Sequence, residues 1–245
     1  MQIRINQFLL ALSFLTRLPI GKRDFVGLKL ANSAWAFPLV GAIVGAWGWA
    51  VYASSLSIGI SPIISAWLAI FSQIILTGGL HEDGLADTAD GLASGRNQEQ
   101  KLAIMRDSRI GSYGVVALLI AISLRANAIA IFPAHSLLFF MAAGATSRAL
   151  MVILMRGSAN ARKDGLSASA GRPTGKQTIF SLLVGFFSLF IATSFLKAIF
   201  CVIIIAIIFF VIREITRKNF GGITGDVIGA SQQIIEVALL ILLGR

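Results

Sequence analysis

The sequence predicts an all-α protein: a polytopic bundle of about seven transmembrane helices that forms a single membrane domain over residues 1–245. Of the 245 residues, 56% are hydrophobic and only 13% are charged, proportions unusual for a soluble domain. The stretch 30–80 contains no Asp, Glu, Lys or Arg. Because about 20 apolar residues suffice to cross a bilayer, this stretch alone has room for two spans.

The first element expected along the chain is a short apolar helix at 8–15, preceded by Arg4. The run is too short to span a bilayer, and Arg17 and Pro19 interrupt it. No small-residue cleavage pattern follows, which argues against a secretory signal peptide. We therefore expect an amphipathic helix that lies at the membrane interface.

The spanning helices are expected at apolar runs bounded by charged residues, Pro or Gly. These runs lie at 31–53, 60–80, 113–132, 135–155, 177–195, 198–212 and 226–243. Cys201 is the only cysteine and falls inside one of them, so an internal disulfide and a cysteine-based metal site are excluded.

The basic residues predict the orientation of these spans, because cytoplasmic loops are enriched in Lys and Arg. Of the 21 basic residues, all but four fall on one side; Lys197 and Arg245 lie on the other, and Arg125 and Arg148 lie within spans. The N-terminus is therefore expected in the cytoplasm. The basic residues are dispersed over separate loops, which favours anionic lipid as their partner, leaves recognition of an anionic substrate at the same surface open and argues against nucleic acid. The sequence leaves a homo-oligomer open.

The acidic residues gather in the segment 81–112, where six of the 11 fall: Glu82, Asp83, Asp87, Asp90, Glu99 and Asp107. Asp83, Asp87 and Asp90 are four and three residues apart, so a helix presents them on one face. Their mutual repulsion and their hard oxygen atoms favour Mg²⁺, Mn²⁺ or Ca²⁺ as a ligand. Magnesium is usually held by one or two carboxylates together with phosphates, so a phosphorylated substrate is expected.

A second stretch that can reach this site is 104–114, at the end of a predicted span. Asp107 is a further candidate metal ligand there, and Arg109 can bind phosphate through its planar guanidinium. Gly111 and Gly114 can accommodate phosphate oxygens against the backbone.

Two more segments are expected at the same side of the membrane. Gly222 and Gly225 precede Asp226, another candidate metal ligand, although a simple turn between helices explains these glycines as well. The basic loop 156–176 contains several Gly residues and one Pro, which predict an irregular, mobile lid.

Charged and titratable residues near or inside the spans are functional candidates because they are costly in lipid. Arg125 lies about 18 Å into its span and needs an anionic partner, for which Glu236 is the candidate. The simpler interpretation is that Arg125 and Glu236 form an ion pair with a structural role only. Arg148 is expected near the cytoplasmic end, within reach of a substrate phosphate. His81 adjoins the acidic residues as a base, unless it only forms a hydrogen bond at a helix end.

Five sequence motifs, in order along the whole chain, resemble the family of adenosylcobinamide-GDP ribazoletransferases, also called cobalamin synthases. They are FLTRLP at 14–19, FPLVG at 37–41, TGGLHEDGLADTADG at 77–91, IMRDSRIGSYG at 104–114 and GGITGDVIGA at 221–230. The longest is specific, since its glycines, His81 and three spaced aspartates must coincide. Glu82 and Gln233 depart from the family pattern, so no role is assigned to either.

The resemblance implies transfer of α-ribazole, or its 5′-phosphate, onto adenosylcobinamide-GDP, which releases GMP and forms adenosylcobalamin or its 5′-phosphate. It also implies Mg²⁺, the bacterial inner membrane and an active site facing the cytoplasm. A ribazole hydroxyl would attack the cobinamide-side phosphorus, and an aspartate or His81 would receive its proton. The implied acidic and basic positions are Asp83, Asp87, Asp90, Asp107, Asp226, Arg109 and Arg148.

Two alternatives remain at this stage. A CDP-alcohol phosphatidyltransferase also uses spaced aspartates on a membrane helix, but the pattern DxxDGxxAR does not occur in this sequence. A divalent-cation carrier would need acidic residues near the middle of the bilayer, whereas most of them fall on one side here.

Overall fold

The computed structural model describes residues 2–21, 25 and 27–244, and this part of the chain is a bundle of helices without a β-strand. The elements are α1 Gln2–Leu15, the 3₁₀ helix η1 Leu30–Ala36, α2 Phe37–Ser57, α3 Pro62–Thr77, α4 Leu80–Ser94, α5 Gln98–Ile104, α6 Ser112–Ala130, α7 Leu137–Gly157, α8 Leu166–Ala170, α9 Gly175–Ala192, α10 Phe195–Phe220 and α11 Gly225–Leu243.

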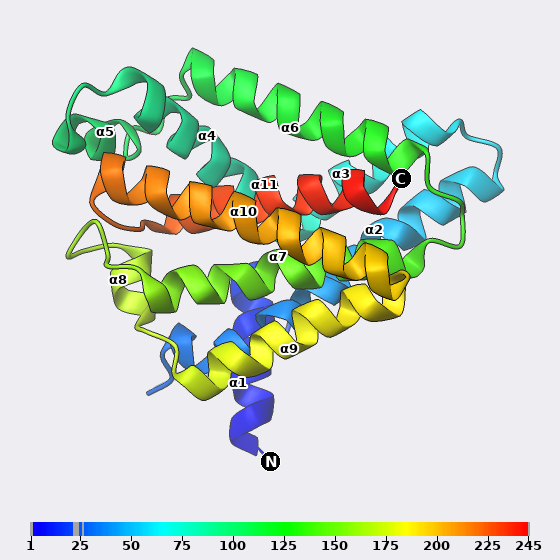
Figure 1. Cartoon of the computed structure of the whole chain (residues 1–245), viewed down its shortest axis with the longest axis horizontal. Coiled ribbons are helices and arrows are strands. Elements are labelled where there is room, and N and C mark those ends of the chain that lie inside the picture. Colours follow the sequence, from blue (N-terminus) through cyan, green and yellow to red (C-terminus); the bar gives the residue numbers. More distant parts are fainter. Residues whose placement is uncertain (1, 22–24, 26, 245) are drawn as a thin grey trace.

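The long helices run side by side along one direction, and α1 crosses them (Figure 1). Six segments are long and apolar enough to cross a membrane, and the bent pair α3 and α4 raises the number to seven if it forms one span. The protein is therefore a polytopic helical membrane protein, as the sequence predicts.

The centre of the bundle is formed by α7 and α11, in which 72% of the most apolar window is buried, against 22% in α9 and α10. The outer helices expose large apolar side chains such as Phe187, Ile203 and Phe210. These side chains belong in contact with lipid, since a soluble surface seldom carries so many.

Glycines allow α2 and α7 to pack with their backbones in contact. A Cβ atom on Gly41 would lie 2.1 Å from the carbonyl oxygen of Gly144, and one on Gly45 would lie 2.2 Å from that of Phe140. Small residues spaced by four are typical of close helix pairs in membranes.

Between α3 and α4 the chain turns by 92°. Gly78 and Gly79, with φ of +68° and +69°, form the bend. This left-handed conformation is readily available only to glycine, so the bend is encoded by these two residues. The expected span 60–80 consequently ends as a helix at Thr77.

Most helix positions agree with the sequence predictions, but three details differ: the end of α10, a helix inside the basic loop and the character of α1. α10 continues to Phe220 instead of ending near 212, because a left-handed Gly221 and not the charge at Arg213 terminates it. The basic loop 156–176 is not wholly irregular, since it contains α8. Lys22, Arg23 and Arg245, counted in the orientation argument, lie outside the described residues.

The third difference concerns α1, which is a helix but not a clearly amphipathic one. Ile3 and Ile5 are exposed, whereas Gln7 is buried. Gln7 is held there because its Oε1 accepts a hydrogen bond from Nε1 of Trp35 at 2.9 Å. The contact of α1 with η1 therefore buries a polar side chain, and α1 does not have separate polar and apolar faces.

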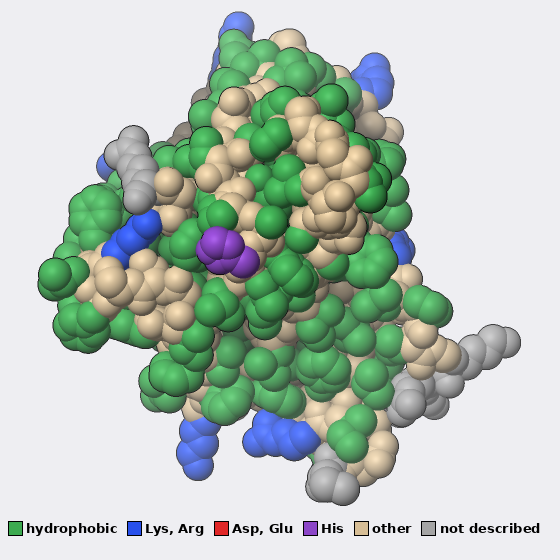
Figure 2. Space-filling model, turned by 90° about the vertical axis from the view of Figure 1, so that its right-hand side faces the viewer, with side chains coloured by type: hydrophobic (Ala, Val, Ile, Leu, Met, Phe, Trp, Pro, Cys, Tyr) green, Lys and Arg blue, Asp and Glu red, His purple; other side chains and the backbone are tan. Residues whose placement is uncertain are grey.

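The loops that carry the acidic motifs lie at one end of the bundle. This polar end comprises the second half of α4, α5, the loop 105–111, the loop 158–174 with α8, and the turn 221–224 (Figure 1). The opposite end, which faces the viewer in Figure 2, shows mainly apolar and neutral side chains and no Asp or Glu. The expectation that the acidic motifs share one end is thus confirmed.

Candidate active site

At the polar end, α4 and the start of α11 touch through their backbones. A Cβ atom on Gly84 would lie 2.6 Å from the carbonyl oxygen of Asp226. Because Asp83 and Asp87 flank Gly84 on successive turns of α4, this close approach brings their carboxylates near Asp226. The contact joins two motifs that are far apart in the sequence.

The three carboxylates affect one another electrostatically. Asp83 is exposed and Asp87 is partly buried. The pKa of Asp87 is raised to about 7, first because burial penalises its charged form, and then because Asp83, Asp226 and Asp90 repel that charge. A bound cation would relieve this repulsion.

The carboxylates of Asp83, Asp87 and Asp226 do not form a closed set of metal ligands in this structure. Among the described residues, no three Asp, Glu, His or Cys side chains are close enough together to hold a metal ion. Asp83, Asp87 and Asp226 nevertheless supply the hard oxygen atoms that Mg²⁺ prefers, and magnesium commonly takes its remaining ligands from water and phosphate. Their assignment as metal ligands stays a prediction, and the chemistry of these oxygen donors is compatible with it.

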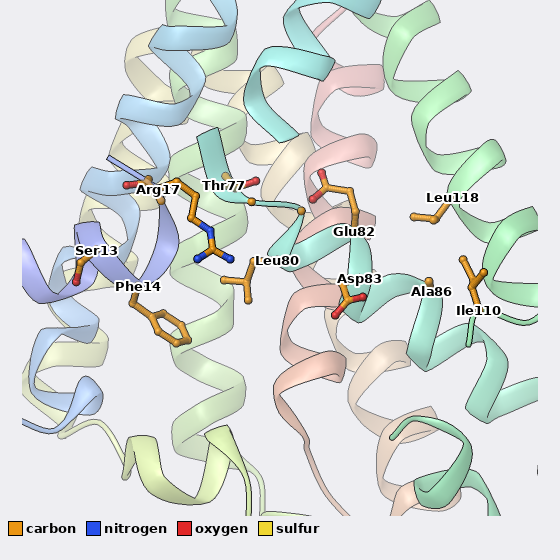
Figure 3. Close-up of a pocket in the computed structure, with 13 residues that line it drawn as sticks. Ser13, Phe14, Arg17, Thr77, Leu80, Glu82, Asp83, Ala86, Ile110 and Leu118 are labelled. Carbon is orange, nitrogen blue, oxygen red and sulfur yellow. The ribbon is translucent and has the colours of Figure 1, made fainter. Parts of the chain in front are cut away.

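Asp83 stands between two cavities. The larger, of about 690 Å³, is bounded by the end of α1, the bend and α6, and its residues include Arg17, Gly78, Glu82, Asp83 and Leu118 (Figure 3). The smaller, of about 120 Å³, is lined by residues that include His81, Asp83, Gly225 and Asp226. Ligand pockets usually measure about 300–1,000 Å³, so the larger cavity can receive part of a substrate.

His81, a predicted catalytic residue, is buried, with 1% of its surface exposed. Its Nε2 atom has no hydrogen-bond partner within the described chain. A buried nitrogen without a partner is costly, and His81 reaches the smaller cavity beside Asp83 and Asp226. Its position is compatible with a role toward a ligand there.

Asp90 caps the N-terminus of α6. Its two carboxylate oxygens accept hydrogen bonds from the backbone N–H groups of Gly111 and Gly114 at 2.7 and 2.9 Å. Phosphate binding by these two glycine N–H groups would require the hydrogen bonds to open. Each oxygen of Asp90 keeps a further lone pair, so metal binding by Asp90 stays a prediction.

Asp107 and Arg109 form an exposed ion pair at 2.8 Å. The pKa of Asp107 is lowered to about 2, chiefly by the hydrogen bond from the Arg109 side chain. Neither residue is among the charges that shift the pKa of Asp87 or of Asp226, so the structure does not gather this pair with them.

Gly222, another predicted residue, belongs to the turn 221–224 beside the site. Gly222 packs against the basic loop, because a Cβ atom on it would lie 2.3 Å from the carbonyl oxygen of Ala159. Backbone hydrogen bonds between Ile223 and residues 159 and 161 pin the basic loop to this turn. The loop also brings Arg162, which sequence reasoning missed, to 4.0 Å from the carboxylate of Asp226.

A buried network of charged side chains lies deeper in the bundle. Arg125 contacts Glu236 at 2.6 Å, which confirms the predicted ion pair, and Arg148 contacts the other oxygen of Glu236 at 3.2 Å. The sequence predicted that Arg148 would be open to the polar end, but only 2% of its surface is exposed. The cause is Glu236, which draws it inward.

Sequence reasoning missed the uncharged and acidic partners in this network. Glu82 lies 3.5 Å from Arg125 and accepts a hydrogen bond from Gln233 at 3.0 Å. Gln73 accepts one from Arg125 at 2.8 Å. The available signal was the presence of glutamines within apolar runs, where an unpaired amide is costly.

The fold and this site together define a class: a polytopic membrane protein with a carboxylate site and a ligand-sized cavity at one end of its bundle. The sequence profile of the cobalamin-5-phosphate synthase family matches residues 7–244, and the chain belongs to that family.

Curated relatives agree over nearly the full length. The chain is 41% identical over 235 residues to adenosylcobinamide-GDP ribazoletransferase of Bradyrhizobium diazoefficiens, covering 95% of this chain and 90% of the relative. The proteins of the same name from Mesorhizobium japonicum and Sinorhizobium medicae are 38% and 40% identical, covering 97% and 94% of this chain and 92% of each relative. No solved structure matches.

Proposed function

We propose that this protein transfers α-ribazole, or its 5′-phosphate, onto adenosylcobinamide-GDP, with release of GMP, as the nucleotide-loop assembly step of cobalamin synthesis. The observation that carries the proposal is the pairing of α4 with α11, which unites the two acidic motifs of the family beside a cavity of about 690 Å³. Full-length similarity to relatives named for this activity supports it.

Mg²⁺ is the cofactor that fits the donor set, with Asp83, Asp87 and Asp226 as its ligands. When bound, it would neutralise charge on the pyrophosphate and on the departing GMP. The raised pKa of Asp87 accords with this assignment, because the crowded carboxylates lack a counter-charge. Arg162, at 4.0 Å from Asp226, supplies a further positive charge beside these carboxylates.

The protein's part in the transfer is mainly to orient two substrates. A ribose hydroxyl oxygen that is free both in α-ribazole and in its 5′-phosphate forms a bond to the cobinamide-side phosphorus, and the bond from that phosphorus to the bridging oxygen breaks. GMP leaves with the bridging oxygen, and the hydroxyl proton passes to a base. Asp83 and His81, which line the same small cavity, are the candidates for this base.

We also propose that the polar end faces the cytoplasm of a bacterium and that the bundle lies in its inner membrane. The basic loops at the polar end support this orientation through the excess of Lys and Arg expected on the cytoplasmic side.

The test supplies detergent-purified protein with adenosylcobinamide-GDP, α-ribazole and Mg²⁺ and measures GMP and adenosylcobalamin. Equal amounts of both products are expected, and a chelator should stop their formation until Mg²⁺ is restored. A folded protein that yields neither product in the presence of Mg²⁺ would refute the proposal.

A further inference from the structure

The motif at 14–19 has no part in the site described so far, yet it ends on the wall of the large cavity. Its Arg17 follows α1, and its backbone N–H donates to the carbonyl oxygen of Leu76, at the end of α3, at 2.7 Å. This hydrogen bond fixes the base of the side chain beside the bend. Figure 3 shows the guanidinium extending from α1 toward Leu80, on the opposite side of Asp83 from Leu118.

The guanidinium lies flat against the bend. A Cβ atom on Gly78 would meet Nε of Arg17 at 2.3 Å and Cζ at 3.1 Å, so a side chain at position 78 would displace it. Gly79 has the same left-handed conformation, but a Cβ atom there would meet nothing within 4 Å. Gly78 therefore accommodates Arg17 in addition to forming the bend.

Arg17 is exposed and its charge is not paired with a carboxylate of the described chain. Its side chain has no ion pair or hydrogen bond with the rest of the described chain. Among the described residues that line the cavity it is the only basic one. The Thr16 and Thr77 hydroxyls, which line the same cavity, already donate to carbonyl oxygens within their own helices.

The other charged lining residues are Glu82, which is already paired with Arg125, and Asp83, so an anion fits best beside Arg17 and the start of α4. The N-terminus of α4 begins at Leu80, next to Gly79, and its partial positive charge faces the same cavity. Across from Arg17 stands Asp83, which the proposed function makes a metal ligand. An anion held between a guanidinium and a metal-bearing carboxylate would be stabilised from both sides.

We propose that Arg17 binds the pyrophosphate of the nucleotide-bearing substrate in this cavity, opposite Asp83, through a bidentate contact to its phosphoryl oxygens. The assignment rests on the proposed function for the identity of the substrate. A phospholipid head group has the same phosphate chemistry and could reach a site at the end of α1, so the experiment must separate the two sources.

The first experiment measures binding of adenosylcobinamide-GDP with α-ribazole withheld, so that no transfer takes place. Arg17→Gln is expected to weaken binding about 10-fold or more, because a charge-assisted contact is lost. Arg17→Lys, which keeps the charge but not the planar guanidinium, should lie in between. Arg96→Gln is the matched control, since Arg96 is exposed at the same end and does not line the cavity.

The binding assay is run in a maltoside detergent, which has no phosphate, and in phosphatidylcholine nanodiscs. A loss of affinity in both media supports a nucleotide pyrophosphate. A loss confined to nanodiscs would mean that Arg17 holds lipid and would overturn the proposal, as would equal affinity of Arg17→Gln, Arg96→Gln and the parent protein.

A second pair of variants changes the backbone against which the Arg17 guanidinium packs and keeps its charge. Gly78→Ala and Gly79→Ala impose the same left-handed strain, but only the first displaces the guanidinium. Gly78→Ala should raise the KM for adenosylcobinamide-GDP several-fold above that of Gly79→Ala, while the KM for phosphate-free α-ribazole stays equal in both. Equal KM values for the nucleotide substrate would count against the proposal.

These readouts also separate the two hypotheses. If the parent protein forms no cobalamin, the proposed function fails, whereas binding of adenosylcobinamide-GDP that depends on Arg17 would keep the subsite. If cobalamin forms and the Arg17 variants bind and turn over normally, the subsite fails alone.

Discussion

At the scale of single residues, the three aspartates of α4 share one helix and differ in what surrounds them. Asp83 is open to two cavities, Asp87 is partly buried among like charges, and Asp90 is occupied by two backbone N–H groups. The spacing of four and three predicts a common face, but neighbours on α6 and α11 decide which carboxylates are available. Asp83 and Asp87 are the two whose carboxylates accept no hydrogen bond within the described chain.

Asp87→Asn is nearly isosteric and removes one carboxylate charge from the proposed magnesium site. We expect turnover to fall at least about 100-fold, because several kcal/mol of charge stabilisation are lost. Product formation and Mg²⁺ titration of the purified variant measure this. Glu99→Gln, a charge removal on exposed α5, is the control and should keep its activity. An active Asp87→Asn would remove Asp87 from the site.

Glu236 is the shared partner of two buried arginines. Glu236→Gln leaves Arg125 and Arg148 with only Glu82 to balance them, so we expect a loss of about 3 kcal/mol or more in stability. Thermal and denaturant unfolding in detergent, followed by Trp fluorescence, measure it. Glu214→Gln, on the exposed part of α10, should leave the unfolding temperature unchanged. Similar curves for the two variants would contradict this account.

At the scale of elements, close helix packing depends on glycine at particular contacts. Gly41 and Gly144 bring α2 and α7 together, and Gly84 brings α4 to Asp226 on α11. The first contact supports the centre of the bundle, and the second assembles the site. The sequence shows these glycines, but only the paired structure shows which of them meet another backbone.

Gly41→Leu should separate α2 from α7 and destabilise the bundle, because its Cβ atom alone would lie 2.1 Å from a carbonyl oxygen. The expected result is a lower unfolding temperature and faster proteolysis in detergent. Gly157→Ala is the control, since a Cβ atom there meets nothing within 4 Å and alanine favours a helix. Unchanged stability of Gly41→Leu would show that α2 and α7 can accommodate a larger side chain at this contact.

At the scale of the whole molecule, the acidic motifs lie at one end and the opposite end shows no carboxylate in Figure 2. This asymmetry follows from an alternation of helices that returns the chain to the polar end after α3, α7 and α10. Each return delivers one motif or loop of the site, so the connectivity of the bundle gathers segments from across the sequence.

The orientation can be tested with single cysteines in a Cys201→Ala background. Asn97→Cys lies at the polar end and should react with an impermeant maleimide in inverted vesicles but not in intact spheroplasts. Ser194→Cys, exposed between α9 and α10 at the opposite end, should give the reverse pattern. Labelling of Asn97→Cys from outside the cell would invert the proposed topology.

The sequence by itself determined the membrane class, the approximate spans and the clustering of carboxylates, because each depends on the local hydropathy and charge of a segment. It also predicted the Arg125–Glu236 pair, since a lone charge in lipid requires a partner. Only the tertiary structure decided that Asp90 caps α6, that Arg148 turns inward and that Arg17 borders the cavity. These outcomes depend on which distant backbones approach one another, and local periodicity carries no information about that.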